Sequence, residues 1–149
     1  GPIRTQANEV AAMLADPRRC QGLLVTLAEE TPVNEVVELA YDLEEKIGLT
    51  LGPLVVNACW PDRPGLHMSP TAAARAQGVK LSRAAKAALD ISGEFGRQRL
   101  EGQSRQLTRL GQLLPLSRVI LPRIPTARFG PAELDVLADA LSVDPVGAR

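Results

Sequence analysis

The residue with the most specific binding chemistry in this chain is Asn57, which ends the apolar run Pro-Leu-Val-Val-Asn at residues 53–57. Its amide provides an acceptor oxygen and an N–H₂ donor group, which suit the edge of an adenine or a guanine. The carboxyl end of a buried strand is also where open α/β sheets bind their ligands. The alternative is an asparagine that satisfies a turn, and the spacing alone favours that alternative.

A second candidate for ligand recognition is the segment that follows the short apolar run at residues 117–121. It contains Leu121, Pro122, Arg123 and Ile124, and Pro125 follows directly. Proline restricts backbone φ and removes a hydrogen-bond donor, so this loop is rigid. A rigid loop after a strand can lie against a flat base. The alternative is that the prolines only stiffen the loop.

No familiar catalytic motif occurs in the sequence. It lacks G-x-x-x-x-G-K-[ST], G-x-G-x-x-G, G-x-S-x-G and H-E-x-x-H. Glu29 and Glu30 form a carboxylate pair, but neighbouring residues need not converge on one substrate. We favour a role at a helix N-terminus, where negative charge complements the helix dipole. The sequence therefore indicates a binding function for this chain more strongly than a catalytic one.

Four breakers, three of them prolines, mark the segment after Asn57 as a loop, and it contains the only tryptophan and the only histidine. For Trp60 we favour loop packing over base stacking. For His67 we favour a solvated position over a metal ligand. The arginines at 97, 99, 105 and 109 fall on a predicted helix, where a solvated face is the favoured interpretation and a partner-binding surface the alternative.

The elements that must position these residues are two apolar runs, at residues 22–27 and 53–58, with an amphipathic segment between them. The runs lack polar alternation, which is typical of parallel strands buried on both faces. The segment between them predicts a helix with Thr31 as N-cap, Pro32 in its first position and Gly48 just past its end. Strand, helix and strand at this spacing predict a right-handed βαβ unit.

The rest of the chain predicts further helices at residues 3–15, 71–77, 82–91 and 95–114, and one after Gly130-Pro131. A third strand is expected at residues 117–121, and the tail at 142–149 is expected to fray. We therefore predict one α/β domain over residues 1–149, with a three-stranded parallel sheet and helices on both faces.

Composition limits the classes of partner. The 149 residues contain 17 basic and 17 acidic side chains, so no net field attracts nucleic acid. No apolar run approaches the ~20 residues of a membrane span, and no signal peptide is recognisable. Cys20 and Cys59 form no C-x-x-C pair, which favours a cytoplasmic location.

Residues 24–48, LVTLAEETPVNEVVELAYDLEEKIG, followed by LGPLVVN at 51–57, resemble the C-terminal half of the ArsA family of P-loop ATPases. The actinobacterial branch is the most similar, with a G-P-x-x-x-Q-A opening helix and a V-T-L-x-E-x-x-P-V-x-E strand and helix. The matching positions are Gly1, Pro2, Gln6, Ala7, Val25, Thr26, Leu27, Glu29, Pro32, Val33 and Glu35. The final strand, loop and helix are also similar, whereas residues 63–112 match no motif of the family.

The resemblance implies the C-terminal half of a P-loop NTPase fold that binds ATP with Mg²⁺ and works as a dimer. It implies that Asn57 reads adenine and that Leu121, Pro122, Arg123 and Ile124 contribute to the adenine pocket. The family's P-loop and switch regions lie in an N-terminal half, so the expected partner is that missing half or a paired ATPase subunit, in a homodimer or heterodimer. A link to membrane-protein targeting or anion transport follows by the same resemblance. The alternative is a non-catalytic interaction module that binds a partner through the helix at residues 97–109.

Overall fold

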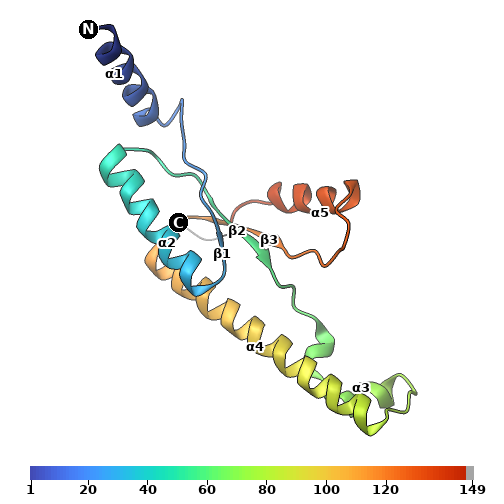
Figure 1. The fold of residues 1–149 in the computed structure, drawn as a ribbon. Helices are drawn as coiled ribbons and strands as arrows, with labels where there is room; N and C mark the ends of the chain where they lie inside the picture. Colours follow the sequence, from blue (N-terminus) through green and yellow to red (C-terminus); the bar gives the residue numbers. More distant parts are fainter. Residues whose placement is uncertain (147–149) are drawn as a thin grey trace.

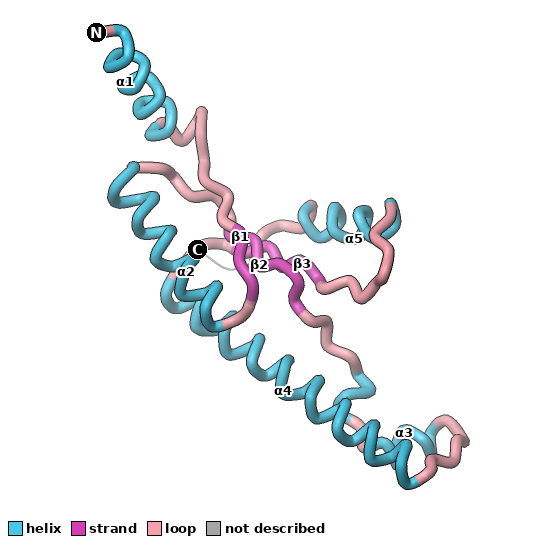
Figure 2. The backbone as a smooth tube through the Cα atoms, in the orientation of Figure 1, coloured by secondary structure: helices cyan, strands magenta, loops and turns pink. Residues whose placement is uncertain are grey.

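A parallel β-sheet forms the centre of the molecule (Figures 1 and 2). The computed structural model describes residues 1–146, and within them the sheet has three strands in the order β1-β2-β3. They are β1 (Val25–Leu27), β2 (Leu54–Cys59) and β3 (Arg118–Pro122). Leu27 pairs with Asn57, and Val55 pairs with Val119. The predicted α/β class and the parallel direction of the strands are confirmed.

The helices that connect the strands pack on one face of the sheet. α2 (Glu30–Asp42) leads from β1 to β2, and α4 (Arg83–Leu113) leads back to β3. Leu54 and Val56 of β2 are buried against α2 and the end of α4, in a cluster with Val33 and Leu110. Because right-handed crossovers that progress in one direction return on the same side, both helices cover this face.

α5 (Pro131–Leu141) covers part of the opposite face (Figure 1). Val55, Val119 and Leu121 form a second cluster there, against Leu137 and Ala140 of α5. Alternate residues of β2 therefore enter different clusters, as successive side chains of a strand must. Helices on both faces were predicted, and the structure confirms them.

The expectation that the first strand is buried on both faces is wrong for one face. Thr26 is 6% exposed, but Val25 next to it is 58% exposed and Leu23 is 62% exposed. α5 reaches the clusters of β2 and β3 and leaves β1, which lies at the edge of the sheet, uncovered on that side. Hydrophobicity alone predicts burial, whereas actual burial depends on a covering element.

The predicted start of α2 is also wrong. The helix begins at Glu30 with Glu29 in the N-cap position, and the N–H of Val33 donates to the Glu29 carbonyl at 3.0 Å. Pro32 therefore lies third in the helix, which costs little because N–H groups of the first turn have no intrahelical partner. The helix continues into a π-helical turn, Leu43–Ile47, and Gly48 follows it at φ 74°, as predicted.

A single helix, α4, replaces the two predicted at residues 82–91 and 95–114. Its predicted cap is present, since the Ser82 hydroxyl accepts a hydrogen bond from the N–H of Ala85 at 3.1 Å. Gly93 and Gly96 do not break the helix. A Cβ at Gly96 would lie 2.8 Å from Cδ2 of Leu66, so this glycine allows another segment to pack closely.

The remaining elements lie at the two ends of the molecule. α1 (Pro2–Ala15) has no buried residue and projects away from the sheet (Figure 1). A 3₁₀ turn, Pro64–His67, and α3 (Pro70–Ala76) pack against the N-terminal part of α4. In the tail predicted to fray, Val146 pairs with Arg118 through backbone hydrogen bonds of 2.7 and 2.8 Å, and residues 147–149 lie outside the described residues. No helix of the described part of the chain has the length and apolar character needed to cross a membrane.

Candidate functional site

A cavity of about 370 Å³ opens at the carboxyl ends of β1 and β2. The strand ends, the start of α2, the middle of α4 and the segment after β3 all contribute to its wall. The lining residues are Leu27, Ala28, Glu29, Glu30, Asn57, Ala58, Trp60, Arg99, Gly102, Gln103, Gln106 and Arg123. The cavity therefore lies where the arrangement of parallel strands predicts a ligand site.

Asn57 lies in this wall, and its oxygen also holds the turn that follows. Oδ1 accepts a hydrogen bond from the N–H of Ala58 at 2.8 Å. Ala58 has φ 53°, in the left-handed region that non-glycine residues rarely adopt. The sheet register is irregular between Val56 and Cys59. The hydrogen bond from Ala58 to Asn57 is the contact that the turn interpretation expects. The side-chain N–H₂ group of Asn57 has no hydrogen bond within the described residues.

The hydrogen bond to Ala58 also orients the amide of Asn57. An N–H donor needs an oxygen opposite it, so the side-chain N–H₂ group must point the other way. Oδ1 has a second lone pair, so the amide retains both donors and one acceptor site for a ligand. Turn formation and ligand recognition are therefore compatible in this one side chain.

The predicted loop residues separate in space. Arg123 lines the cavity together with Asn57. Leu121 is buried in the cluster with α5, on the opposite face of the sheet, and Pro122 pairs with Cys59. Ile124 is half-buried outside the cavity wall. Arg123 lies just past the end of β3, where strand alternation no longer fixes the side-chain direction, so the structure brings only this one residue of the loop to the site.

Trp60 is a lining residue whose contacts the sequence analysis did not predict. Its backbone N–H donates to Oε1 of Gln103 at 2.7 Å, and its carbonyl accepts from Nε2 of the same side chain at 3.1 Å. The guanidinium carbons of Arg99 and Arg123 lie 5.0 and 4.6 Å from the centre of the indole ring. Loop packing therefore describes Trp60 well, and the packing partners are charged.

Of the four arginines that the sequence singled out on α4, Arg97 and Arg109 are half-buried, which the solvated-face interpretation does not predict. Arg97 donates to the carbonyl of Leu66 at 2.9 Å, and Arg109 donates to the side chain of Asn34. Arg99 and Arg105 are both exposed, as that interpretation predicts, although Arg99 also lies over Trp60. These contacts join α4 to distant segments, which no local pattern reveals.

Two carboxylates and two guanidinium groups share the cavity wall. Glu29 and Glu30 lie at the start of α2, as the helix-terminus interpretation predicts, and Arg99 and Arg123 lie beside Trp60. Within the described residues, no ion pair of 4 Å or less involves any of these four groups. The wall therefore provides donors, acceptors and planar cations, balanced in formal charge.

Cys59 lies close to the site in sequence but is not available to it. The residue is 4% exposed, and burial raises the pKa of its thiol. His67 is exposed, and its ring pairs with Asp62 at 3.2 Å, which agrees with the predicted solvated position. In residues 1–146 no group of three or more potential ligands could hold a metal ion. The arrangement at the strand ends is suited to binding a polar, flat ligand.

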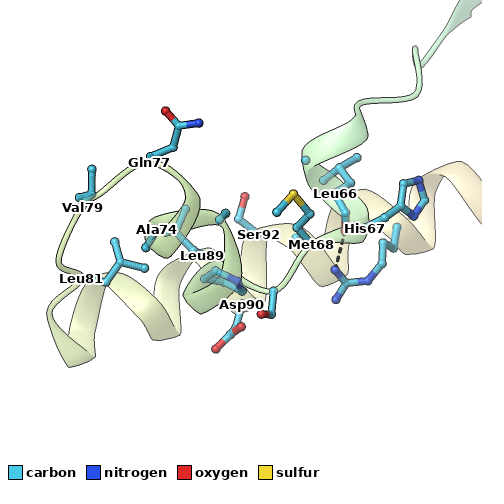
Figure 3. A pocket seen from close by; sticks show the side chains of 16 residues that line it. Leu66, His67, Met68, Ala74, Gln77, Val79, Leu81, Leu89, Asp90 and Ser92 are labelled. Atoms are coloured by element: carbon cyan, nitrogen blue, oxygen red, sulfur yellow. Dashed lines mark hydrogen bonds between the residues drawn. The ribbon is translucent and has the colours of Figure 1, made fainter.

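A larger cavity, of about 710 Å³, lies at the far end of α4 (Figure 3). Its wall combines the 3₁₀ turn, α3 and the N-terminal part of α4, with apolar side chains such as Leu66, Met68, Leu81 and Leu89. His67 and Arg97 line this cavity, whereas Asn57 and residues 121–124 do not.

No family model matches the sequence, and no curated protein matches it significantly.

Proposed function

We propose that this chain is the C-terminal part of an ArsA-like ATPase and supplies the adenine-binding side of an ATP site. The observation that carries this proposal is that Asn57, near the end of β2, and Arg123, just after the neighbouring parallel strand β3, line one cavity at the carboxyl edge of the sheet. Ligands of open α/β sheets bind at this edge. An asparagine amide that keeps both donors and one lone pair can make the paired hydrogen bonds that recognise adenine.

Hydrolysis of ATP requires groups that this proposal assigns to another polypeptide segment. Phosphoryl transfer depends on a phosphate-binding loop, a lysine and Mg²⁺. In our proposal the missing N-terminal half or a paired ATPase subunit, in a homodimer or heterodimer, supplies them. A cytoplasmic location and a link to membrane-protein targeting or anion transport belong to the same proposal.

The open edge of β1 supports the assignment to the C-terminal half of a P-loop NTPase fold. The described residues provide no strand beyond β1, and Val25 and Leu27 on this strand are exposed. A third hollow, of about 320 Å³ and mostly apolar, lies along this strand, between it and α2, and Val36 and Leu39 help to line it. A further strand and helix from the missing half would cover these apolar groups.

The alternative is a non-catalytic module that binds a partner through residues 97–109 of α4. It has less support, because Arg97, Arg99 and Arg109 are engaged in contacts within the chain. Arg105 alone among these arginines lacks such a contact within the described residues. A partner would have to displace contacts that join α4 to the rest of the molecule.

Saturation-transfer-difference NMR with adenosine, ATP and cytidine tests the adenine-binding role in the 149-residue chain. Adenosine and ATP should both show saturation of the base protons H2 and H8, because the cavity recognises the base. Cytidine, whose smaller ring presents a different edge, should show much less. Equal saturation of adenosine and cytidine, or none for either purine ligand, would contradict the proposal.

A further inference from the structure

We propose that Arg123 provides the surface on which the purine base stacks, and that Trp60 holds the guanidinium flat for this purpose. This inference rests on the proposed adenine-binding function and extends it by naming how the flat face of the base is recognised. Asn57 would read the edge of the base, and Arg123 would contact its face.

Trp60 is a fixed support because α4 holds its backbone. Gln103 both accepts from the N–H of Trp60 and donates to its carbonyl, as a neighbouring strand would, across 43 residues of sequence. Both hydrogen bonds are of normal length, at 2.7 and 3.1 Å. Because both of its backbone groups are held in this way, Trp60 loses little further backbone freedom when a ligand binds.

The indole itself is not open to a base. Two guanidinium groups lie over its ring, at 4.6 Å for Arg123 and 5.0 Å for Arg99. A base that stacked directly on Trp60 would have to displace one of them and lose a cation–π contact. The accessible planar group is therefore a guanidinium supported by the ring.

Arg123 is better placed for this role than Arg99. It is exposed, lines the cavity with Asn57 and follows β3 directly. Its backbone is held, because its N–H donates to the carbonyl of Cys59 at 2.7 Å. The guanidinium carbon of Arg99 also lies 5.4 Å from the centre of the Phe95 ring, so Arg99 contacts a second aromatic side chain. A guanidinium is planar and stacks on aromatic faces, so with one face on Trp60 its other face can receive a base.

The charges of the wall favour the nucleoside part of the ligand over its phosphates. Glu29 and Glu30 lie in the same wall as the two arginines. Carboxylates repel phosphate groups but accept hydrogen bonds from ribose hydroxyls, as an acidic residue does in dinucleotide-binding folds. The ligand class is therefore a purine nucleoside, with any phosphates directed out of the cavity.

Trp60 provides the readout, because it is the only tryptophan. Adenosine is titrated into the full 149-residue chain with excitation at 295 nm, and the change in Trp60 emission gives the Kd. Arg123→Lys keeps the charge but loses the plane, and Arg105→Lys is the matched control on α4. Arg123→Lys should weaken adenosine binding about tenfold, which corresponds to ~1.4 kcal/mol. Arg105→Lys should leave the Kd unchanged.

The other outcomes separate this inference from the proposed function. Adenosine binding that Asn57→Ala weakens and Arg123→Lys does not would overturn the stacking role and leave the adenine site in place. Competition between pyrophosphate and adenosine would also overturn the stacking role, because the arginines would then bind phosphate. A wild-type chain without any adenosine binding by emission and by NMR would overturn both proposals. Far-UV circular dichroism of each variant distinguishes lost stacking from misfolding. Arg123→Gln, which keeps a planar end group without the charge, should retain more of the adenosine affinity than Arg123→Lys.

Discussion

At the scale of the residue, Asn57 has two roles that different substitutions can separate. Its oxygen holds the N–H of Ala58, whose φ of 53° would otherwise be unsupported. Its N–H₂ group makes no hydrogen bond within the described residues and lies in the cavity wall. An aspartate keeps the oxygen for Ala58 and removes the two donors. Replacement by aspartate therefore tests recognition, whereas replacement by alanine removes both roles.

For an ATP site assembled with its P-loop half, we expect Asn57→Ala and Asn57→Asp each to weaken ATP binding by ~1–3 kcal/mol, the usual cost of an unpaired polar partner. GTP affinity should change less, since guanine presents a different edge. Calorimetric titration of both nucleotides measures this, with Asn8→Asp on the exposed α1 as the control. Equal losses for ATP and GTP would leave Asn57 as a turn residue only.

The two cysteines should differ in reactivity towards iodoacetamide. The thiolate is the reactive form, and burial raises the pKa of Cys59 and hides its sulfur, whereas Cys20 is half-buried. Mass spectrometry of the native chain at neutral pH should show modification of Cys20 first. The rates should become similar in denaturant, and faster labelling of Cys59 in the native chain would show that β2 opens readily.

At the scale of the element, α4 shows why glycine within a helix is ambiguous in a sequence. Gly96 faces Leu66, and a Cβ there would approach it to 2.8 Å. Gly102 has nothing nearer to a Cβ than the guanidinium of Arg105, at 3.9 Å. Both glycines cost helix stability through backbone entropy, but only Gly96 gains a packing contact in return.

Replacing these two glycines by alanine should therefore have opposite effects. Gly102→Ala should raise the free energy of unfolding by ~0.4–1 kcal/mol, the gain expected where the backbone conformation suits alanine. Gly96→Ala should lower it, because Leu66 must move. Urea denaturation followed by circular dichroism measures both.

A double substitution isolates the contact between α4 and the 3₁₀ turn. In a Leu66→Ala background, Gly96→Ala should become stabilising, since the obstructing side chain is gone. A destabilisation of the same size in both backgrounds would mean that the helix, and not this contact, opposes the change.

At the scale of the whole molecule, the sheet is incomplete on the side of β1. Val25 is exposed on β1, and Leu23 is exposed just before it; the outer edge of this strand has no partner within the described residues. Open, apolar strand edges promote association. The isolated chain should therefore show a mass that rises with concentration in light scattering, together with strong binding of a hydrophobic dye.

The substitution Val25→Lys should reduce both association and dye binding, because a charge on an edge strand opposes pairing. Val10→Lys, at an exposed apolar position of α1, is the matched control and should change them less. A wild-type chain of concentration-independent monomer mass with little dye binding would contradict the open edge. The stand-alone module would then be the better interpretation.

The isolated 149-residue chain should also show no ATPase turnover above blank, with or without Mg²⁺. The sequence contains no phosphate-binding motif, so transition-state charge on the phosphoryl group would have no preorganised partner. Phosphate release followed over repeated purification steps measures this. Turnover that persists through purification would refute the assignment of phosphate chemistry to another half.

The sequence by itself determined the features that depend on neighbouring residues. Apolar runs without alternation predicted parallel strands, and the local patterns at Ser82 and Gly48 predicted a helix start and a helix end that the structure contains. Asn57 was identified because the apolar run ends there, although β2 continues past it to Cys59. Its role in the turn and its place in the cavity were both consistent with that position.

Only the tertiary structure decided which distant groups meet. The pairing of Trp60 with Gln103 spans 43 residues, and Arg99 and Arg123 reach the same ring from different elements. The segment at residues 121–124 was a single candidate in the sequence, but Leu121 lies within β3 and faces α5, whereas Arg123 lies past the end of the strand, in the cavity wall. Such contacts depend on where the crossover connections place each element, and local sequence patterns do not determine that placement.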